Sequence, residues 1–181
     1  LTRRVTVSRR LPPAQIHAVT RRTANRCRFL NPRDGVRELM GYCLGRALEK
    51  CPDVKLFAYS ANSTHPHVVV LDDPEPGRPS VLPPFFRNLH SLLARAMNTR
   101  LGRGGSFFCD GSYDNVELHG QPTLEEQLVY AWTNVTKDGL VERADDWPGL
   151  QFLPEDLGKT FVFTKPKDGF FGGRRPAGTV P

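Results

Sequence analysis

The chain has 181 residues, of which 39% are hydrophobic and 24% charged, a balance that suits one globular domain with a real core. No apolar run approaches the ~18 residues of a membrane-spanning helix, which argues against a membrane protein. The four cysteines form no C-x-x-C pair, which argues against a structural zinc site. Their irregular spacing favours a reducing compartment, so we expect a cytoplasmic protein.

Positive charge is concentrated at the start of the chain. The net charge is +6, and residues 1–30 carry no acidic side chain. The arginines of that stretch are Arg3, Arg4, Arg9, Arg10, Arg21, Arg22, Arg26 and Arg28. A one-sided basic segment indicates a polyanionic partner, most often a nucleic acid, although a solubilising arm would have the same composition. We expect a flexible basic arm at 1–14, a folded domain at 15–150 and a loose Gly/Pro/basic tail at 151–181.

Apolar periodicity predicts seven elements in the order β-α-β-β-α-β-α. They are strands at 15–23, 54–60, 65–72 and 113–120 and helices at 33–51, 84–100 and 122–139. Thr123 and Glu126 form a capping box near the start of the last helix, and Gly139 suits its C-terminal cap. This order predicts an α+β fold, with a mainly antiparallel sheet and helices packed on it.

The stretch NSTHPHVVVLDD (62–73) places His65 and His67 at the head of a valine run. Because strand side chains alternate, both imidazoles are expected on one face, ~7 Å apart, where they can converge on one cation. The valines that follow predict a central strand covered on both faces. Two half-exposed histidines without a ligand would fit the same pattern.

The helix predicted at 122–139 places a tyrosine beside an amide. Its apolar face is expected to comprise Leu124, Leu128, Ala131, Trp132 and Val135. Tyr130 lies off that face, on a polar stripe with Gln127, Asn134 and Lys137. Asn134 is one turn beyond Tyr130, so the two side chains are predicted neighbours. This pair is either a nucleophile beside a metal ligand or a surface tyrosine beside a solvated amide.

Three segments together resemble a known family. THPHVVV (64–70) is similar to the HUH motif, which often has the pattern N-H-x-H followed by aliphatic residues. NLHSLLARAMNTRLGRGGSFF (88–108) is similar to the family's S-L-x-x-x-[YA]-x-x-x-N-x-R helix and the glycine loop after it. YAWTNVTKDGLVERADDWP (130–148) resembles the tyrosine segment Y-x-x-x-N-P-V-x-A-G-L-V-x-x-x-x-D-[YW]-P. Over about residues 15–150 the chain therefore resembles the single-tyrosine HUH transposases, particularly the REP-associated tyrosine transposase branch.

The resemblance implies a ferredoxin-like or RRM-like HUH endonuclease fold. It also implies cleavage and rejoining of single-stranded or hairpin DNA through a covalent 5′-phosphotyrosine. Tyr130 would be the nucleophile, and His65, His67 and Asn134 would hold a divalent metal, Mg²⁺ or Mn²⁺. A free phenol is a weak nucleophile at neutral pH because its pKa is near 10, so the metal would neutralise and orient the scissile phosphate.

The chain departs from the family pattern at three positions. Pro66 stands between the histidines, where an aliphatic residue is usual, and proline is disfavoured in a central strand because it cannot donate a ladder hydrogen bond. A bulge or an unpaired strand start could absorb it. Thr64 replaces the usual asparagine, and Val135 replaces the proline after the helix asparagine. None of the three removes a proposed catalytic atom.

Basic side chains would supply affinity for DNA phosphates. One candidate surface comprises Arg21, Arg22 and Arg26, a second comprises Arg87 and Arg95 on the helix at 84–100, and Lys137 lies near Tyr130. The protein would act as a monomer or homodimer. Two other functions remain open at this point: a basic DNA-binding protein that has lost catalysis, and a metal-dependent phosphoesterase that forms no covalent intermediate.

Overall fold

The structure is a computed structural model that describes residues 11, 13–33, 35–167 and 169–172. Its main elements are β1 Ile16–Thr20, α1 Val36–Lys50, β2 Val54–Ala61, β3 Pro66–Asp72, α2 Leu82–Arg100, β4 Asp114–Leu118, α3 Gly120–Lys137 and β5 Gln151–Phe152. Short 3₁₀ turns are η1 Ala24–Arg26, η2 Ala144–Asp146, η3 Pro154–Asp156 and η4 Gly169–Phe171. The predicted basic arm falls mostly on residues 1–10 and 12, which lie outside the described residues.

The strands form one antiparallel sheet in the order β4-β1-β3-β2-β5. The first six elements run β-α-β-β-α-β, which with this strand order is the ferredoxin-like arrangement. The predicted α+β fold with a mainly antiparallel sheet is confirmed. The short edge strand β5 was not predicted, since two residues carry no readable alternation.

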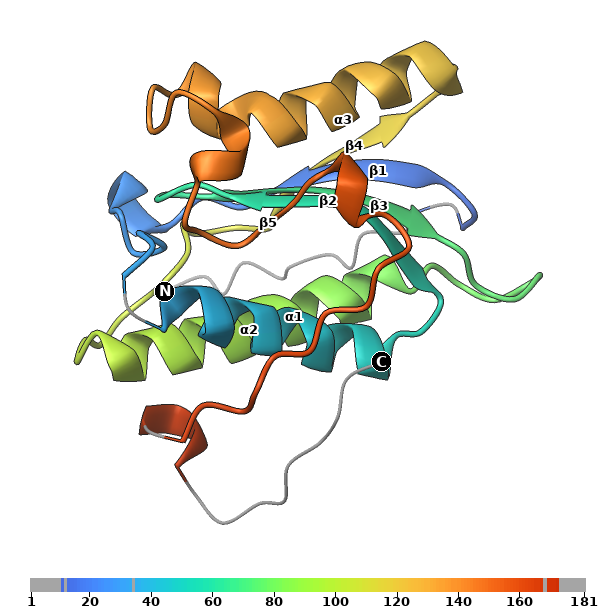
Figure 1. Ribbon diagram of the computed structural model, residues 1–181. Helices are drawn as coiled ribbons and strands as arrows, with labels where there is room; N and C mark the ends of the chain where they lie inside the picture. Colours follow the sequence, from blue (N-terminus) through green and yellow to red (C-terminus); the bar gives the residue numbers. More distant parts are fainter. Residues whose placement is uncertain (1–10, 12, 34, 168, 173–181) are drawn as a thin grey trace.

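Helices lie on both faces of the sheet: α1 and α2 on one, α3 on the other (Figure 1). The core against α1 and α2 contains Val68 and Val70 of β3, whereas the smaller core against α3 contains Val69 of β3, Ala58 of β2 and Ala131 of α3. This division follows strand alternation and explains the valine run, because β3 is the middle strand and both its faces are buried. Within the described residues, no helix is both long and apolar enough to cross a membrane.

Pro66 is the first residue of β3, so the strand begins one residue later than predicted. It pairs with Ala61 of β2, whereas the pairing with β1 starts only at His67, opposite Thr20. Proline therefore stands where no β1 ladder bond is needed, a position that strands tolerate. As a consequence, His65 belongs to the turn before the strand and not to the strand itself.

The ends of α3 differ in how well they were predicted. Gly139, at φ +66°, follows the helix, and the Gly139 and Leu140 N–H groups donate to the Thr136 and Val135 carbonyls, as in a Schellman cap. The capping box at Thr123 and Glu126 is wrong. The helix begins at Gly120, two residues before the predicted start, and Pro122 is tolerated there because it lies in the first helical turn.

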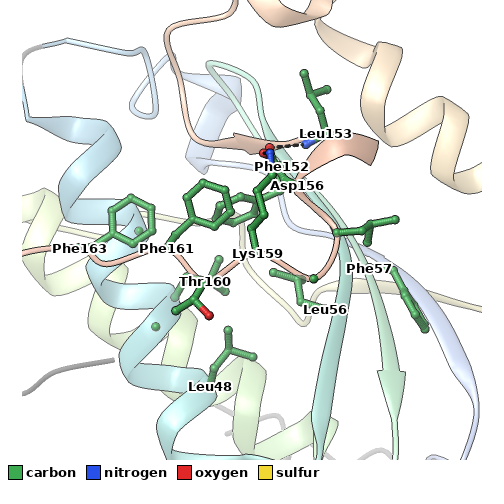
Figure 2. A pocket seen from close by; sticks show the side chains of 15 residues that line it. Leu48, Leu56, Phe57, Phe152, Leu153, Asp156, Lys159, Thr160, Phe161 and Phe163 are labelled. Carbon is green, nitrogen blue, oxygen red and sulfur yellow. Dashed lines mark hydrogen bonds and ion pairs between the residues drawn. The ribbon is translucent and has the colours of Figure 1, made fainter. Parts of the chain in front are cut away.

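The segment after residue 150 is packed and not loose as predicted. Phe152 in β5 pairs with Tyr59 of β2, and the segment then crosses α1 (Figure 1). Phe161 and Phe163 lie next to Phe152 around an apolar hollow of about 210 Å³ (Figure 2). A side chain at Gly41 of α1 would overlap the Phe163 ring, so this glycine admits the segment. Residues 168 and 173–181 of the predicted tail lie outside the described residues.

Candidate active site between β3 and α3

Two histidines and a tyrosine line one hollow between β3 and α3. The hollow has a volume of about 250 Å³ and its lining includes His65, His67, Tyr130 and Arg22. The ring centroids of His65 and His67 are 4.6 Å apart, and those of His67 and Tyr130 are 5.1 Å apart. The structure thus brings together three residues that the sequence motifs singled out, one from a turn, one from a strand and one from a helix.

The turn that carries His65 is held by hydrogen bonds to two other parts of the chain. The Thr64 carbonyl accepts from the Thr23 N–H at 2.8 Å, and the Ser63 carbonyl accepts from the Leu30 N–H at 3.0 Å. The side-chain oxygen of Asn62 accepts from the backbone N–H of His65 at 2.9 Å. A turn braced in this way can place a side chain as firmly as a strand does, which is why His65 meets His67 from outside β3.

Both imidazoles are in an environment that favours their neutral form. Burial, then the nearby His65 and Arg22, lowers the pKa of His67 to about 3. Burial, Arg22 and Arg26 lower the pKa of His65, and the carboxylate of Asp138 partly offsets them. A neutral imidazole keeps a lone pair on one nitrogen, which is the form that binds a metal.

Tyr130 is the accessible member of the group. Its side chain is 39% exposed, and the Lys137 ammonium lies 5.0 Å from the centroid of its ring. The ring rests edge-to-face on buried His67, so the phenol is fixed on one side and open to a large substrate on the other. A cation beside the ring would stabilise negative charge that develops on the phenol oxygen.

Asn134 is not on an exposed polar stripe, so that part of the interpretation of α3 is wrong. Its side chain is 2% exposed, and its Oδ1 accepts a hydrogen bond from Asn62 Nδ2 at 3.0 Å. It does not line the hollow with Tyr130. Position 134 therefore faces inward on α3. The buried side chain of Asn62 satisfies the hydrogen-bonding capacity of Asn134 there.

The residues of the hollow fit a divalent cation through the histidines only. The Nε2 atom of His67 is buried and has no hydrogen-bond partner, as expected of a nitrogen that a ligand would complete. Among the described residues, no group of three or more His, Cys, Asp or Glu side chains could hold a metal. His65 and His67 would therefore hold the ion together with phosphate and water oxygens, and the role of Asn134 as a ligand stays a prediction.

Three of the basic residues predicted to bind DNA lie around this hollow. Arg22 is in its lining and exposed, and Arg26 is close enough to lower the pKa of His65. Lys137 lies over the Tyr130 ring. These three cations lie near the histidines or Tyr130, and the carboxylate of Asp114 also lines the hollow.

The other three predicted arginines lie on the α2 side of the sheet. Arg21 and Arg87 line a groove of about 750 Å³ between α2 and the loop at 106–113, and Arg95 lies 5.1 Å from the Phe170 ring. Arg21 contacts the His90 Nδ1 at 3.2 Å and donates to the Gly111 carbonyl at 3.3 Å, so it holds the loop. The predicted DNA surface is therefore split between two faces.

The sequence interpretation missed Asn62 and Asp138, which join the histidine turn to α3. Asn62 Nδ2 donates to Asp138 Oδ2 at 2.9 Å as well as to Asn134. A signal was present: in the tyrosine motif, Asp138 stands where the family pattern has alanine. A carboxylate so close in sequence to the predicted site residues indicates that a nearby side chain donates a hydrogen bond to that carboxylate.

Comparison with solved structures places this geometry on a known scaffold. A REP-associated tyrosine transposase, solved bound to a REP hairpin, superposes with a TM-score of 0.66 at 14% sequence identity. The match covers 83% of this chain and 84% of that one. The chain has the fold of a REP-associated tyrosine transposase. The resemblance seen in the motifs is therefore confirmed at the level of the fold.

A second solved structure also matches the chain, with a lower TM-score. A candidate transposase from Deinococcus radiodurans R1 matches with a TM-score of 0.45 and 17% identity, over 71% of this chain and 95% of that one. No protein family model and no curated protein matches the sequence. At these identities the transposase likeness concerns the fold, and the chemistry has to be argued from the side chains.

The buried histidines predict that acid destabilises the protein. Burial lowers the pKa of His67 and of His90 to about 3, whereas an unfolded histidine titrates near 6.5. Below pH 6.5 the unfolded chain binds more protons than the folded one, so stability is full above that pH and falls towards pH 3. At pH 5 each histidine should cost about 2 kcal/mol of unfolding free energy.

Urea unfolding at pH 7.5 and pH 5.0 measures this loss. The variant His90→Gln is the comparison, because it removes one of these buried imidazoles and keeps a polar side chain near Arg21. We expect its loss on acidification to be about 2 kcal/mol smaller than that of the wild type, which is the contribution of His90. A free energy of unfolding that stays constant between the two pH values would contradict the assignment of neutral buried histidines.

Proposed function

We propose that the protein is a metal-dependent single-stranded DNA endonuclease and transposase that cuts and rejoins DNA through a covalent 5′-phosphotyrosine on Tyr130. The observation that carries the proposal is the contact of Tyr130 with His67, in a hollow that also contains His65. These residues lie on the fold of a transposase that was solved bound to a REP hairpin. Single-stranded or hairpin DNA is accordingly the proposed substrate.

The proposed reaction is an in-line displacement at phosphorus. The Tyr130 oxygen attacks, a phosphorus–oxygen bond to tyrosine forms, and the bond to the 3′ oxygen of the neighbouring nucleotide breaks. The phenol proton is lost to solvent and the leaving strand gains a proton as its 3′ hydroxyl. A Mg²⁺ or Mn²⁺ ion, when bound, would neutralise the scissile phosphate and orient it. Because the covalent bond conserves the energy of the phosphodiester, a 3′ hydroxyl can reverse the step and join strands without ATP.

The chain's own residues would divide the work. His65 and His67 would hold the ion from the floor of the hollow, since they are neutral and one of their nitrogens has no partner. Lys137 would stabilise charge on the attacking phenol. Arg22, exposed in the lining of the hollow, would bind the phosphate backbone beside the scissile bond.

A denaturing gel tests the proposal directly. A hairpin oligonucleotide with a single-stranded flank, labelled at its 3′ end, is incubated with the protein and Mn²⁺. The label should appear in a protein-sized band that survives denaturation, because the 5′ end of the 3′ fragment becomes attached. Binding without cleavage would favour a decayed DNA-binding protein, and cleavage without a labelled protein band would favour a phosphoesterase.

Arg22 gives a separate prediction about affinity. Arg22→Gln should weaken binding to single-stranded DNA by ~1–2 kcal/mol at low salt, since it removes one charge-assisted phosphate contact. It should also reduce the slope of log affinity against log salt by ~0.7. Fluorescence anisotropy across a salt series measures both quantities.

Arg78 provides the matched control for Arg22. It is an exposed arginine in the loop that follows β3, so it lies beyond the opposite end of that strand from His67. Arg78→Gln changes net charge by the same amount and should leave the affinity nearly unchanged. Equal losses in the two variants would mean that only the overall charge matters, and would remove Arg22 from the proposed site.

A further inference from the structure

Asn62 uses both ends of its buried side chain. Its Nδ2 donates to Asn134 Oδ1 at 3.0 Å and to Asp138 Oδ2 at 2.9 Å. Its Oδ1 accepts from the backbone N–H groups of Thr64 at 3.0 Å and His65 at 2.9 Å. The orientation of the amide follows from these partners, because a backbone N–H only donates and an ionised carboxylate only accepts.

The hydroxyl of Thr64 extends this arrangement to an imidazole nitrogen. Its Oγ1 lies 3.3 Å from Asn62 Oδ1 and 2.9 Å from His65 Nδ1. If the hydroxyl proton pointed to Nδ1, two acceptor oxygens would face each other without a proton between them. If it points to Asn62, then His65 Nδ1 donates to Thr64 and every contact carries one proton.

We propose that Asn62 is a positioning residue which, through Thr64, holds His65 in the tautomer protonated at Nδ1. A neutral imidazole has one N–H, so Nε2 then keeps the lone pair that a divalent cation requires. Asp138 fixes the amide of Asn62 and thereby the direction of the whole chain of hydrogen bonds. The same amide joins the turn of His65 to α3, the helix that carries Tyr130.

The use of this tautomer rests on the proposed function, but the tautomer itself belongs to the metal-free protein and can be observed there. Long-range proton–nitrogen NMR spectra of the ¹⁵N-labelled chain distinguish Nδ1–H from Nε2–H in each histidine. We expect Nδ1–H for His65 in the wild type and in Thr64→Ser, which keeps the hydroxyl. Thr64→Val keeps the branched shape and the backbone bonds of Asn62 but removes the hydroxyl, so His65 should shift towards Nε2–H.

Metal affinity is the second measurement. Titration with Mn²⁺ alone is followed by electron paramagnetic resonance. The affinity for Mn²⁺ in Thr64→Val and in Asn62→Ala should be lower than in the wild type by ~10-fold or more. Thr64→Ser should restore wild-type affinity. Thr160→Val, on the exposed segment that crosses α1, is the control for a threonine-to-valine change outside the site. Asn62→Ala is interpreted only alongside Thr64→Val, because it also removes bonds that hold the turn.

The outcomes separate this inference from the proposed function. Nε2–H in the wild type, or Nδ1–H that persists in Thr64→Val, overturns the inference whatever the protein does to DNA. A tautomer change without any change in Mn²⁺ affinity overturns the link to the metal. The expected tautomer and Mn²⁺ behaviour, combined with absence of any DNA adduct in the wild type, would support the role of Asn62 and reject cleavage through a covalent phosphotyrosine.

Discussion

Replacing Tyr130 with phenylalanine should abolish both strand cleavage and the covalent adduct while leaving the fold intact. The substitution keeps the ring that packs against His67 and removes only the hydroxyl. Without that oxygen no phosphotyrosine can form, so the loss should be complete within detection and not a partial reduction. The measurement is the denaturing gel with 3′-labelled hairpin DNA, followed by peptide mapping of the wild-type adduct to Tyr130.

The structure sharpens this prediction because it separates the four tyrosines. Tyr42, Tyr59 and Tyr113 are all buried, whereas Tyr130 is exposed and lines the hollow with the histidines. Burial also raises the pKa of Tyr59, which disfavours its phenolate. Tyr113→Phe is the matched control, since it makes the same chemical change at a buried ring on the other face of the sheet. An adduct mapped to Tyr113, or cleavage that persists in Tyr130→Phe, would overturn the assignment.

The fold was readable from the sequence where side-chain periodicity is strong. The valines of β3 predicted a strand covered on both faces, and Val68 and Val69 do face the two different cores. The spacing of α1 and α2 predicted helices within three residues of their observed ends. These elements are determined by local alternation, which a single sequence displays.

The packed C-terminal segment could not be read in the same way. Its glycines, prolines and charges are typical of a loop, and it is a loop, but Phe161 and Phe163 pack beside Phe152 against α1. Space for Phe163 exists because position 41 is glycine, more than one hundred residues earlier in the chain. A complementarity of that kind depends on the tertiary structure and leaves no periodic signal.

The candidate site was partly predictable for the same physical reason. Alternation and helical spacing placed His67 and Tyr130 correctly, since each depends on one element. Asn134 was misplaced because its burial depends on Asn62, a residue of a different element that satisfies it. His65 was placed on the right face for an incomplete reason, because a braced turn and not the strand positions it.

Substituting the histidines should separate catalysis from DNA binding. His65→Ala and His67→Ala should each reduce Mn²⁺-dependent cleavage by ~100-fold or more, because a metal ion contributes several kcal/mol to the stabilisation of charge at phosphorus. Affinity for single-stranded DNA should change less than ~2-fold, since the arginines supply most of the phosphate contacts and neither histidine carries a charge at neutral pH. Cleavage rates and anisotropy on the same oligonucleotide measure the two effects.

His119→Ala is the control for removal of a histidine, because His119 is exposed and stands just before α3, outside the hollow. The double variant of His65 and His67 should cleave no better than either single variant, since both would act on one ion.

Taken together with Tyr130→Phe, the results of the histidine variants distinguish the mechanisms. If His65→Ala, His67→Ala and Tyr130→Phe all lose cleavage, the tyrosine and the metal act on the same phosphate. Loss in the histidine variants alone would instead identify a hydrolytic phosphoesterase, and full cleavage by the double variant would remove the histidines from the reaction.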